Sequence, residues 1–143
     1  MTATIQQARD EILSTLTTAW LGDPASADLP MLYPDRSQEP PKQGAWARVT
    51  VQHNTGRQVT LSGETGARRF RRTGIVTVQI FTPLGDGLTL GDELTMIAGR
   101  AFEGITTASG VIFRNVRNRE VGKDKQGWFQ TNVLADFEYD EVR

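Results

Sequence analysis

The chain has no cysteine and only one histidine among its 143 residues. Without cysteine it can form no disulfide, no thiolate metal site and no cysteine nucleophile. The single histidine, His53, stands where we expect a strand to end. A lone histidine is far more often structural or solvated than catalytic. We therefore expect no nucleophile–base pair and no enzymatic activity.

Long apolar runs and phosphate-binding loops are also missing. No apolar stretch approaches the roughly 18 residues that a membrane-spanning helix needs. The N-terminal residues lack the basic segment and apolar run of a signal peptide. The sequence Gly85-Asp86-Gly87 lacks the lysine and spacing of a phosphate loop and predicts a strand-to-helix turn. These absences predict a protein that is soluble and intracellular where it is made, and that uses no cofactor and no membrane.

Charge is nearly balanced overall but unevenly distributed. With 16 basic and 17 acidic residues the net charge is −1, which argues against a general attraction to nucleic acid. Four arginines lie close together and four acids lie near the C-terminus: Arg68, Arg69, Arg71 and Arg72, and Asp136, Glu138, Asp140 and Glu141. A basic and an acidic patch on one subunit permit head-to-tail association into a ring. The alternative is an ordinarily charged surface.

Two segments show helical periodicity. Thr4–Leu21 has one apolar stripe, with Thr4 as the expected N-cap and Gly22-Asp23-Pro24 as the stop. Thr89–Glu103 has a second stripe. Its start resembles a capping box formed by Thr89 and Asp92, and Gly104 suits the position after its end.

Between the first helix and the first strand, residues 22–44 hold five of the six prolines. The apolar residues there show neither helical nor strand periodicity. We therefore expect a long crossover loop that is held on the surface by Leu29, Met31, Leu32 and Tyr33. Loops of this length are uncommon inside compact domains and often face a partner. A plain crossover explains the segment equally well.

Four segments alternate as strands do: Trp46–His53, Ile75–Thr82, Val111–Glu120 and Trp128–Tyr139. The last two are separated by a turn within Val121–Gly127. Together with the helices they predict one α+β domain over residues 1–143. In it, a single antiparallel sheet of about four strands has two helices packed on one face.

The first two strands are expected to form a long hairpin. Their pairing continues outward through Gln58–Leu61 and Ala67–Arg72 to a turn at Ser62–Gly66. Because Arg68, Phe70 and Arg72 point one way and Arg69 and Arg71 the other, this part cannot lie over its own core without burying unpaired charge. Residues 54–74 are therefore predicted to project as a two-stranded ribbon. Such a ribbon is marginal alone, so a subunit, another protein or nucleic acid should order it; the alternative is a mobile hairpin.

The acids of the last strand fall at alternate positions. Asp136, Glu138 and Asp140 share one face and could bind a divalent cation, pair with arginines of a neighbouring subunit, or stay solvated. We expect no metal, and the pattern is equally compatible with pairing to a neighbouring subunit and with solvation. The run Arg68–Arg72, with Phe70 among its arginines, also resembles basic–aromatic segments that grip nucleic acid, but it matches no recognised motif.

In the order and length of its elements the chain resembles the tail terminator family of long-tailed, lambda-like bacteriophages. The resemblance covers nearly the whole chain. It rests on the N-terminal helix, the strands WARVTV (46–51) and RRTGIVTVQIFTP (71–83), the helix after LGDGL (84–88) and the final strand WFQTNVLADFEYDE (128–141). No single motif is diagnostic, because these proteins share no fixed functional residues.

The resemblance implies a structural virion protein at the head-proximal end of the tail. It implies a homo-hexameric ring that caps the tail tube, stops tube polymerisation and presents a surface to the head–tail connector. Its partners are then further copies of itself, the tube protein and a neck protein, while DNA passes through the lumen without specific binding. The arginine segment is expected at a subunit, tube or lumen contact and the acidic strand at a ring interface. Another neck or tail-completion protein, or a nucleic-acid-binding module, remain the alternatives.

Overall fold

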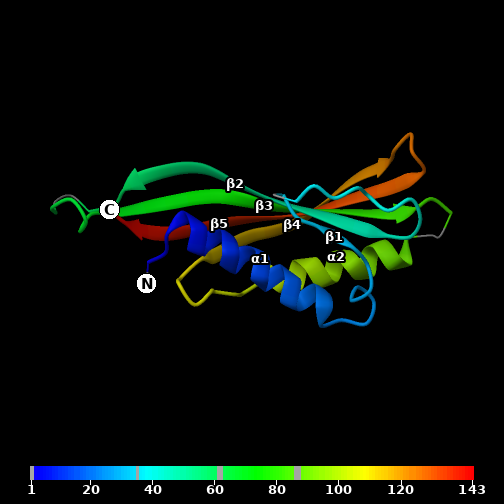
Figure 1. The fold of residues 1–143 in the computed structure, drawn as a ribbon, viewed down its shortest axis with the longest axis horizontal. Coiled ribbons are helices and arrows are strands. Elements are labelled where there is room, and N and C mark those ends of the chain that lie inside the picture. Colours follow the sequence, from blue (N-terminus) through cyan, green and yellow to red (C-terminus); the bar gives the residue numbers. More distant parts are fainter. Residues whose placement is uncertain (1, 35, 61–62, 86–87) are drawn as a thin grey trace.

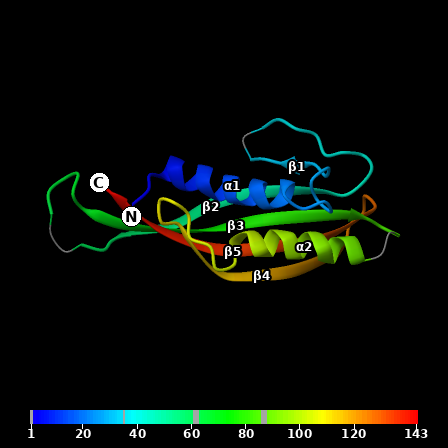
Figure 2. The same ribbon diagram turned by 90° about the horizontal axis from the view of Figure 1, so that it is seen from below.

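Two helices cover one face of a five-stranded sheet in the computed structural model, which describes residues 2–34, 36–60, 63–85 and 88–143 (Figures 1 and 2). Along the chain the elements are α1 (Ile5–Leu21), β1 (Met31–Leu32), β2 (Trp46–Gln58), β3 (Arg69–Pro83), α2 (Thr89–Phe102), β4 (Ile112–Lys123) and β5 (Trp128–Val142). The molecule is elongated along the strands. The predicted α+β class and the two helices on one face are confirmed.

The sheet is mixed, with the order β1-β2-β3-β5-β4, so the expected antiparallel sheet of about four strands was incomplete. The added strand, β1, pairs parallel with β2 through Met31 and Leu32. It lies inside the proline-rich segment 22–44. A two-residue strand is too short to show a period of two, so β1 could not be predicted from the sequence.

The core lies between the helices and the alternate residues of β2, β3 and β5. Ala47, Val49 and Val51 face it from β2, and Val76, Val78 and Ile80 face it from β3. The largest fully buried side chains are Trp20 of α1, Phe102 of α2 and Phe137 of β5. The strands β4 and β5 add an apolar face that meets the helices, formed by Phe113, Val133, Ala135, Phe137 and Tyr139.

The two helix starts differ. At α1 the Thr4 side chain accepts from the Gln7 backbone N–H while the Gln7 side chain accepts from the Thr4 backbone N–H, which completes the capping box. At α2 the expected capping box of Thr89 and Asp92 is wrong. Thr89 is already helical, and the N-cap is Leu88, which makes no side-chain cap bond. Asp92 does lie in the first turn, where the helix dipole favours an acid.

The sheet face that carries no helix, called the open face below, has a small apolar cluster of its own. Trp46 stacks on Phe81 at 4.2 Å between ring centroids, and the Trp128 ring meets Trp46 edge-on at 6.2 Å. Leu32 is buried with them, and the Arg48 guanidinium lies 5.2 Å from the Trp46 ring centroid. The cluster explains why β1 forms, because Leu32 closes it.

At the opposite end the sheet runs beyond the helices. The described part of the β2–β3 connection lies past both chain termini (Figure 1). The pairing of β2 with β3 continues outward to Gln58↔Phe70, as the sequence predicted. Of the predicted turn, Ser62 lies outside the described residues, as does Leu61 of the predicted strand. The same holds for Asp86 and Gly87 of the predicted turn before α2.

The outer part of the hairpin is not the isolated two-stranded ribbon that we expected. β5 continues to Val142 instead of ending near Tyr139, and it pairs with β3 as far as Arg69↔Val142. The arginine segment is therefore the middle strand of three. The charge on both its faces, which had suggested projection, is offset by acids of β5.

Candidate interaction surface at the arginine-rich end of the sheet

The end of the sheet beyond the helices gathers six arginines and three carboxylates. We call it the arginine-rich end and define it by Arg57 of β2, Glu64 and Arg68 of the β2–β3 connection, Arg69, Arg71 and Arg72 of β3, and Asp140, Glu141 and Arg143 at and after the end of β5. Because side chains alternate along a strand, the arginines of β3 divide between the two faces. Each face has its own ion-pair cluster.

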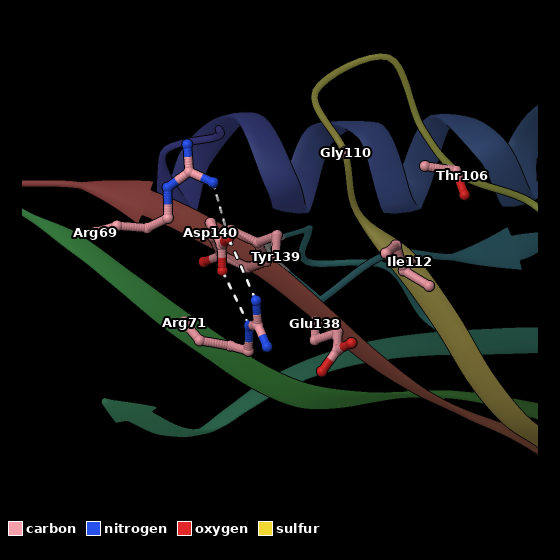
Figure 3. A pocket seen from close by; sticks show the side chains of 8 residues that line it. All are labelled: Arg69, Arg71, Thr106, Gly110, Ile112, Glu138, Tyr139 and Asp140. Carbon is pink, nitrogen blue, oxygen red and sulfur yellow. Dashed lines mark hydrogen bonds and ion pairs between the residues drawn. The ribbon is translucent and has the colours of Figure 1, made fainter. Parts of the chain in front are cut away.

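On the open face two arginines share one carboxylate. Asp140 accepts from Arg71 through both oxygens, at 3.1 Å from Nε and 3.5 Å from Nη2, and from Arg69 Nη1 at 3.4 Å (Figure 3). The hydrogen bond to Asp140, with its negative charge, raises the pKa of Arg71 above its ordinary value. Thr106, Gly110, Ile112, Glu138 and Tyr139 complete the lining of a shallow hollow here.

On the helix face a second acid holds two more arginines. Glu141 is buried and accepts from Arg72 Nε at 3.0 Å, while Arg143 Nε lies at 3.6 Å. The Arg72 side chain crosses Gly56 of β2, where a Cβ atom would meet its Nη1 at 2.2 Å. Arg72 also lies 5.2 Å from the Phe70 ring centroid. Arg72 is thus tied to β2, β5 and its own strand.

Next to this cluster, His53 contacts side chains of the core. Its Nε2 lies 2.7 Å from the Tyr139 hydroxyl, and its ring meets Phe137 and Tyr139 edge-on. Burial lowers the pKa of His53, and the charge of Arg9 on α1 acts in the same direction. Burial, together with the charge of Glu141, raises the pKa of Tyr139 to about 12, so the phenol stays protonated and can donate to neutral His53. The predicted structural role of this histidine agrees with these contacts.

The free energy of unfolding should fall as the pH decreases and His53 becomes protonated. The folded state holds the pKa of His53 below its unfolded value of about 6.5, so the unfolded chain binds more protons in that range and stability drops as pH decreases. Arg9, Arg72 and Glu141 are the charged groups that face the ring. We expect urea unfolding between about pH 8 and about pH 5 to show this loss in the native protein. In His53→Gln the slope should be smaller, and equal slopes would assign it to carboxylates instead.

The other two acids of β5 are also paired within the chain. Arg114 lies 3.1 Å from Glu138, and Arg117 lies 3.3 Å from Asp136, which also accepts from the Asn115 side-chain amide. The open face therefore uses all three predicted acids, Asp136, Glu138 and Asp140, in ion pairs of the same subunit. The sequence had left pairing with a neighbouring subunit and solvation open, and the structure shows pairing within the chain. Whether these acids also reach a ring interface stays a prediction.

The structure brings together most of the residues that the sequence singled out. Arg69, Arg71 and Asp140 meet directly, Arg72 and Phe70 share the helix face, and Arg68 borders them at the exposed connection. Sequence reasoning missed Arg57, which lies directly opposite Arg71. A register shift between His53 and Thr55 moves the outer part of β2 by one residue. If the register of the inner part of β2 and β3 continued without this shift, Phe70 and not Arg71 would lie opposite Arg57.

The chemistry of this surface is ionic recognition. Arginine and carboxylate side chains form bidentate contacts of defined geometry, and no group of three or more histidine or acidic side chains in residues 2–34, 36–60, 63–85 and 88–143 is arranged to hold a metal ion. Neither α1 nor α2 has the length and apolarity that crossing a bilayer requires.

Similar folds occur among solved structures. One, which carries no functional name, superposes with a TM-score of 0.70 at 16% identity and covers 95% of each chain. A chain from the virion of a native gene transfer agent particle superposes with a TM-score of 0.58 at 10% identity, covering 92% of this chain and 96% of that one. At these identities the likeness shows a shared fold.

No curated protein sequence matches the chain. The profile described as phage tail terminator protein matches residues 4–136, which includes both helices and every strand up to the middle of β5. The chain belongs to the phage tail terminator family.

Proposed function

We propose that this protein is the terminator of a phage tail: a ring that caps the tail tube, halts its polymerisation and provides the surface to which the head is joined. The match of the terminator family to residues 4–136 carries the proposal. The role is structural, and the ion pairs described above hold the arginine-rich end together within the subunit. We place the ring in the virion, at the head-proximal end of the tail, after assembly in the host cytoplasm.

Two features of the subunit support a closed ring. Both helices lie on one face of the sheet, which leaves the other face without a helix (Figure 2). At one edge β1 shields β2 only at Ala47 and Arg48, and at the other edge β4 has a neighbour, β5, on one side only within the described residues. A subunit with two different edges associates head-to-tail, and such a contact closes into a ring when the rotation permits.

The two ends of the subunit differ in chemistry, as capping requires. One is the arginine-rich end. The other, where β3 leads into α2 and β4 into β5, exposes Leu84, Leu88 and Val121. A terminator must dock on the tube with one end and present a different surface with the other, so that the next tube ring finds no binding site. Its partners are then the tube protein on one side and a connector or neck protein on the other.

Likeness to a chain of the gene transfer agent virion supports a place in an assembled particle. In such a ring the lumen must let DNA pass, and we propose passage without specific binding. A hexamer is the expected state. A nucleic-acid-binding role is disfavoured because Arg69, Arg71 and Arg72 already contact carboxylates of their own chain.

Deleting the gene from its phage tests the function. Loss of a terminator should give tubes of abnormal, overlong length. Loss of another neck or tail-completion protein should leave tails of normal length that do not join heads, and that result would replace our proposal. Electron microscopy of the lysate measures both tail length and joining.

The native mass of the purified protein tests the ring. We expect a discrete species near six subunits across a range of concentrations. A monomer at all concentrations would show that the ring needs the tube end as a template, and electron microscopy of capped tubes then has to show the ring there.

A further inference from the structure

We propose that the open face of the sheet contacts the sugar–phosphate backbone of duplex DNA, without reading its sequence, through arginines that no acid of the chain neutralises. The inference rests on the proposed function for the choice of DNA, because DNA is the polyanion that passes through the ring. It adds which face of the subunit the DNA meets. Neither helix covers the open face (Figure 2), so a ligand of this size can reach it.

The open face carries an excess of positive charge. Its side chains alternate with the core-facing ones along each strand. Those that are charged are seven arginines and three carboxylates: Arg48, Arg57, Arg69, Arg71, Arg114, Arg117 and Arg119, and Asp136, Glu138 and Asp140. They give this face four net positive charges, so the remainder of a chain whose net charge is −1 has five net negative charges. A polyanion is therefore attracted to one face of the subunit and repelled by the other.

Three of these arginines have no acid of their own. The three carboxylates of the open face contact the other four arginines of this face. Within the described part of the chain, Arg48, Arg57 and Arg119 form no ion pair with any acid. Their guanidinium groups are therefore the donors that an external anion can use.

The spacing of the three arginines fits an extended polyanion. In one row across the sheet, Arg48 of β2 lies opposite Gln79 of β3. Asn132 of β5 follows Gln79, and Arg119 of β4 ends the row. At about 4.8 Å between strands, Arg48 and Arg119 are about 14 Å apart, and Arg57 lies roughly 30 Å from Arg48 along β2. No single acidic side chain reaches all three, whereas duplex DNA has one negative charge per about 1.7 Å of its axis.

The side chains between Arg48 and Arg119 also suit DNA. The row of these two arginines and the next row contain four half-buried, uncharged polar side chains and one apolar side chain: Thr50, Thr77, Gln79 and Asn132, and Leu134. Hydroxyl and amide groups commonly contact phosphate and sugar oxygens. Protein–DNA interfaces are more polar and more positive than interfaces between proteins, whose cores are apolar. The composition of the open face therefore favours DNA over an acidic protein.

Arg48 is held in place for such a contact. Its guanidinium lies 5.2 Å from the ring centroid of Trp46 and 5.9 Å from that of Phe81. A guanidinium that stacks on aromatic rings keeps its N–H groups available for a phosphate. Because the group is already ordered, binding costs less conformational entropy.

The test is a titration of a fluorescently labelled duplex DNA at several salt concentrations, followed by anisotropy. Arg48→Gln with Arg119→Gln is the first double variant. Arg57→Gln with Arg119→Gln is the second, because both of these side chains are exposed and their loss should leave the fold intact. Arg100→Gln, an exposed arginine on α2, is the matched control on the other face. Urea unfolding checks that each variant is folded.

We expect the native protein and Arg100→Gln to bind DNA equally, with an affinity that falls steeply as salt increases. Each double variant should bind about tenfold more weakly or worse, and its slope of log affinity against log salt should be smaller by about two. No binding by the native protein, or equal binding by the double variants, overturns the inference. Displacement of the DNA by poly-glutamate at equal charge concentration overturns it in favour of an acidic protein.

Tail length separates this inference from the proposed function. The native gene, returned to the deletion phage, should restore tails of normal length. Normal tails together with a native protein that binds no DNA overturn the inference alone. Overlong tails despite the native gene contradict the proposed function and, with it, the choice of DNA.

Discussion

Gly74→Ala should destabilise the protein more than any other single-methyl change in the sheet. Gly74 lies in β3, between His53 of β2 and Phe137 of β5. A Cβ atom there would stand 2.2 Å from the Gln52 carbonyl oxygen and 2.4 Å from Cζ of Phe137. Neither neighbour can give way easily, because one is backbone of a paired strand and the other a ring that is 2% exposed.

Overpacking of a well-packed core typically costs about 1–3 kcal/mol, occasionally more. Because backbone is involved, we expect about 3 kcal/mol or more for Gly74→Ala, measured as the free energy of unfolding in urea. The same chemical change at Gly91 is the control. In α2, a Cβ at Gly91 meets Thr82 at an ordinary 3.7 Å, and alanine stabilises helices relative to glycine by about 1 kcal/mol. Similar effects at the two positions would mean that the sheet closes less tightly around Gly74 than the structure shows.

Phe137, whose ring fills the space over Gly74, shows which features of the fold could be predicted from the sequence and which could not. Its alternation with Ala135 and Tyr139 predicted the core-facing side of β5, and the structure confirms it. The close approach to Gly74 could not be predicted, because it depends on which residue of β5 lies opposite. Strand register across β3 and β5 is set by their whole hydrophobic pattern and not by any local signal.

The residues of the candidate surface could be predicted from the sequence, but the contacts between them could not. The arginines of β3 and the acids of β5 stand out in the sequence, and their opposite charges suggested a contact between subunits. Their pairing inside one chain follows from two long-range facts, the length of β5 and its position beside β3. Arg57 was not predicted as part of this surface, because the register shift after His53 changes the face of the sheet on which Arg57 lies. Such irregularities leave no period in the sequence.

The open face around Trp46 shows a second feature that could not be predicted from the sequence, the burial of a side chain. Alternation along the strand places Trp46 on the face opposite to Ala47, Val49 and Val51, away from the helices. It is only 3% exposed there, because Phe81, Leu32 and Trp128 gather from three other strands. Periodicity shows on which face a side chain lies. Burial on that face depends on neighbours that only the fold brings together.

The second large effect should come from Glu141, which anchors the arginine-rich end to the rest of the fold. The side chain of Glu141 is 8% exposed and that of Arg72 is 19% exposed. Replacing Glu141 by alanine leaves the Arg72 guanidinium mostly buried without its acid. Removing one partner of a buried pair costs about 3 kcal/mol, so we expect a loss of that size in the free energy of unfolding.

Glu138→Ala is the matched control for Glu141→Ala. Glu138 lies three residues earlier on the same strand and pairs with Arg114, but these side chains are 26% and 65% exposed. Exposed pairs contribute about 1 kcal/mol or less. We expect Glu141→Ala combined with Arg72→Met to recover much of the stability, since an uncharged pair leaves no buried charge. Equal losses in the two single variants, or no recovery in the double variant, would show that Glu141 acts through packing and not through its charge.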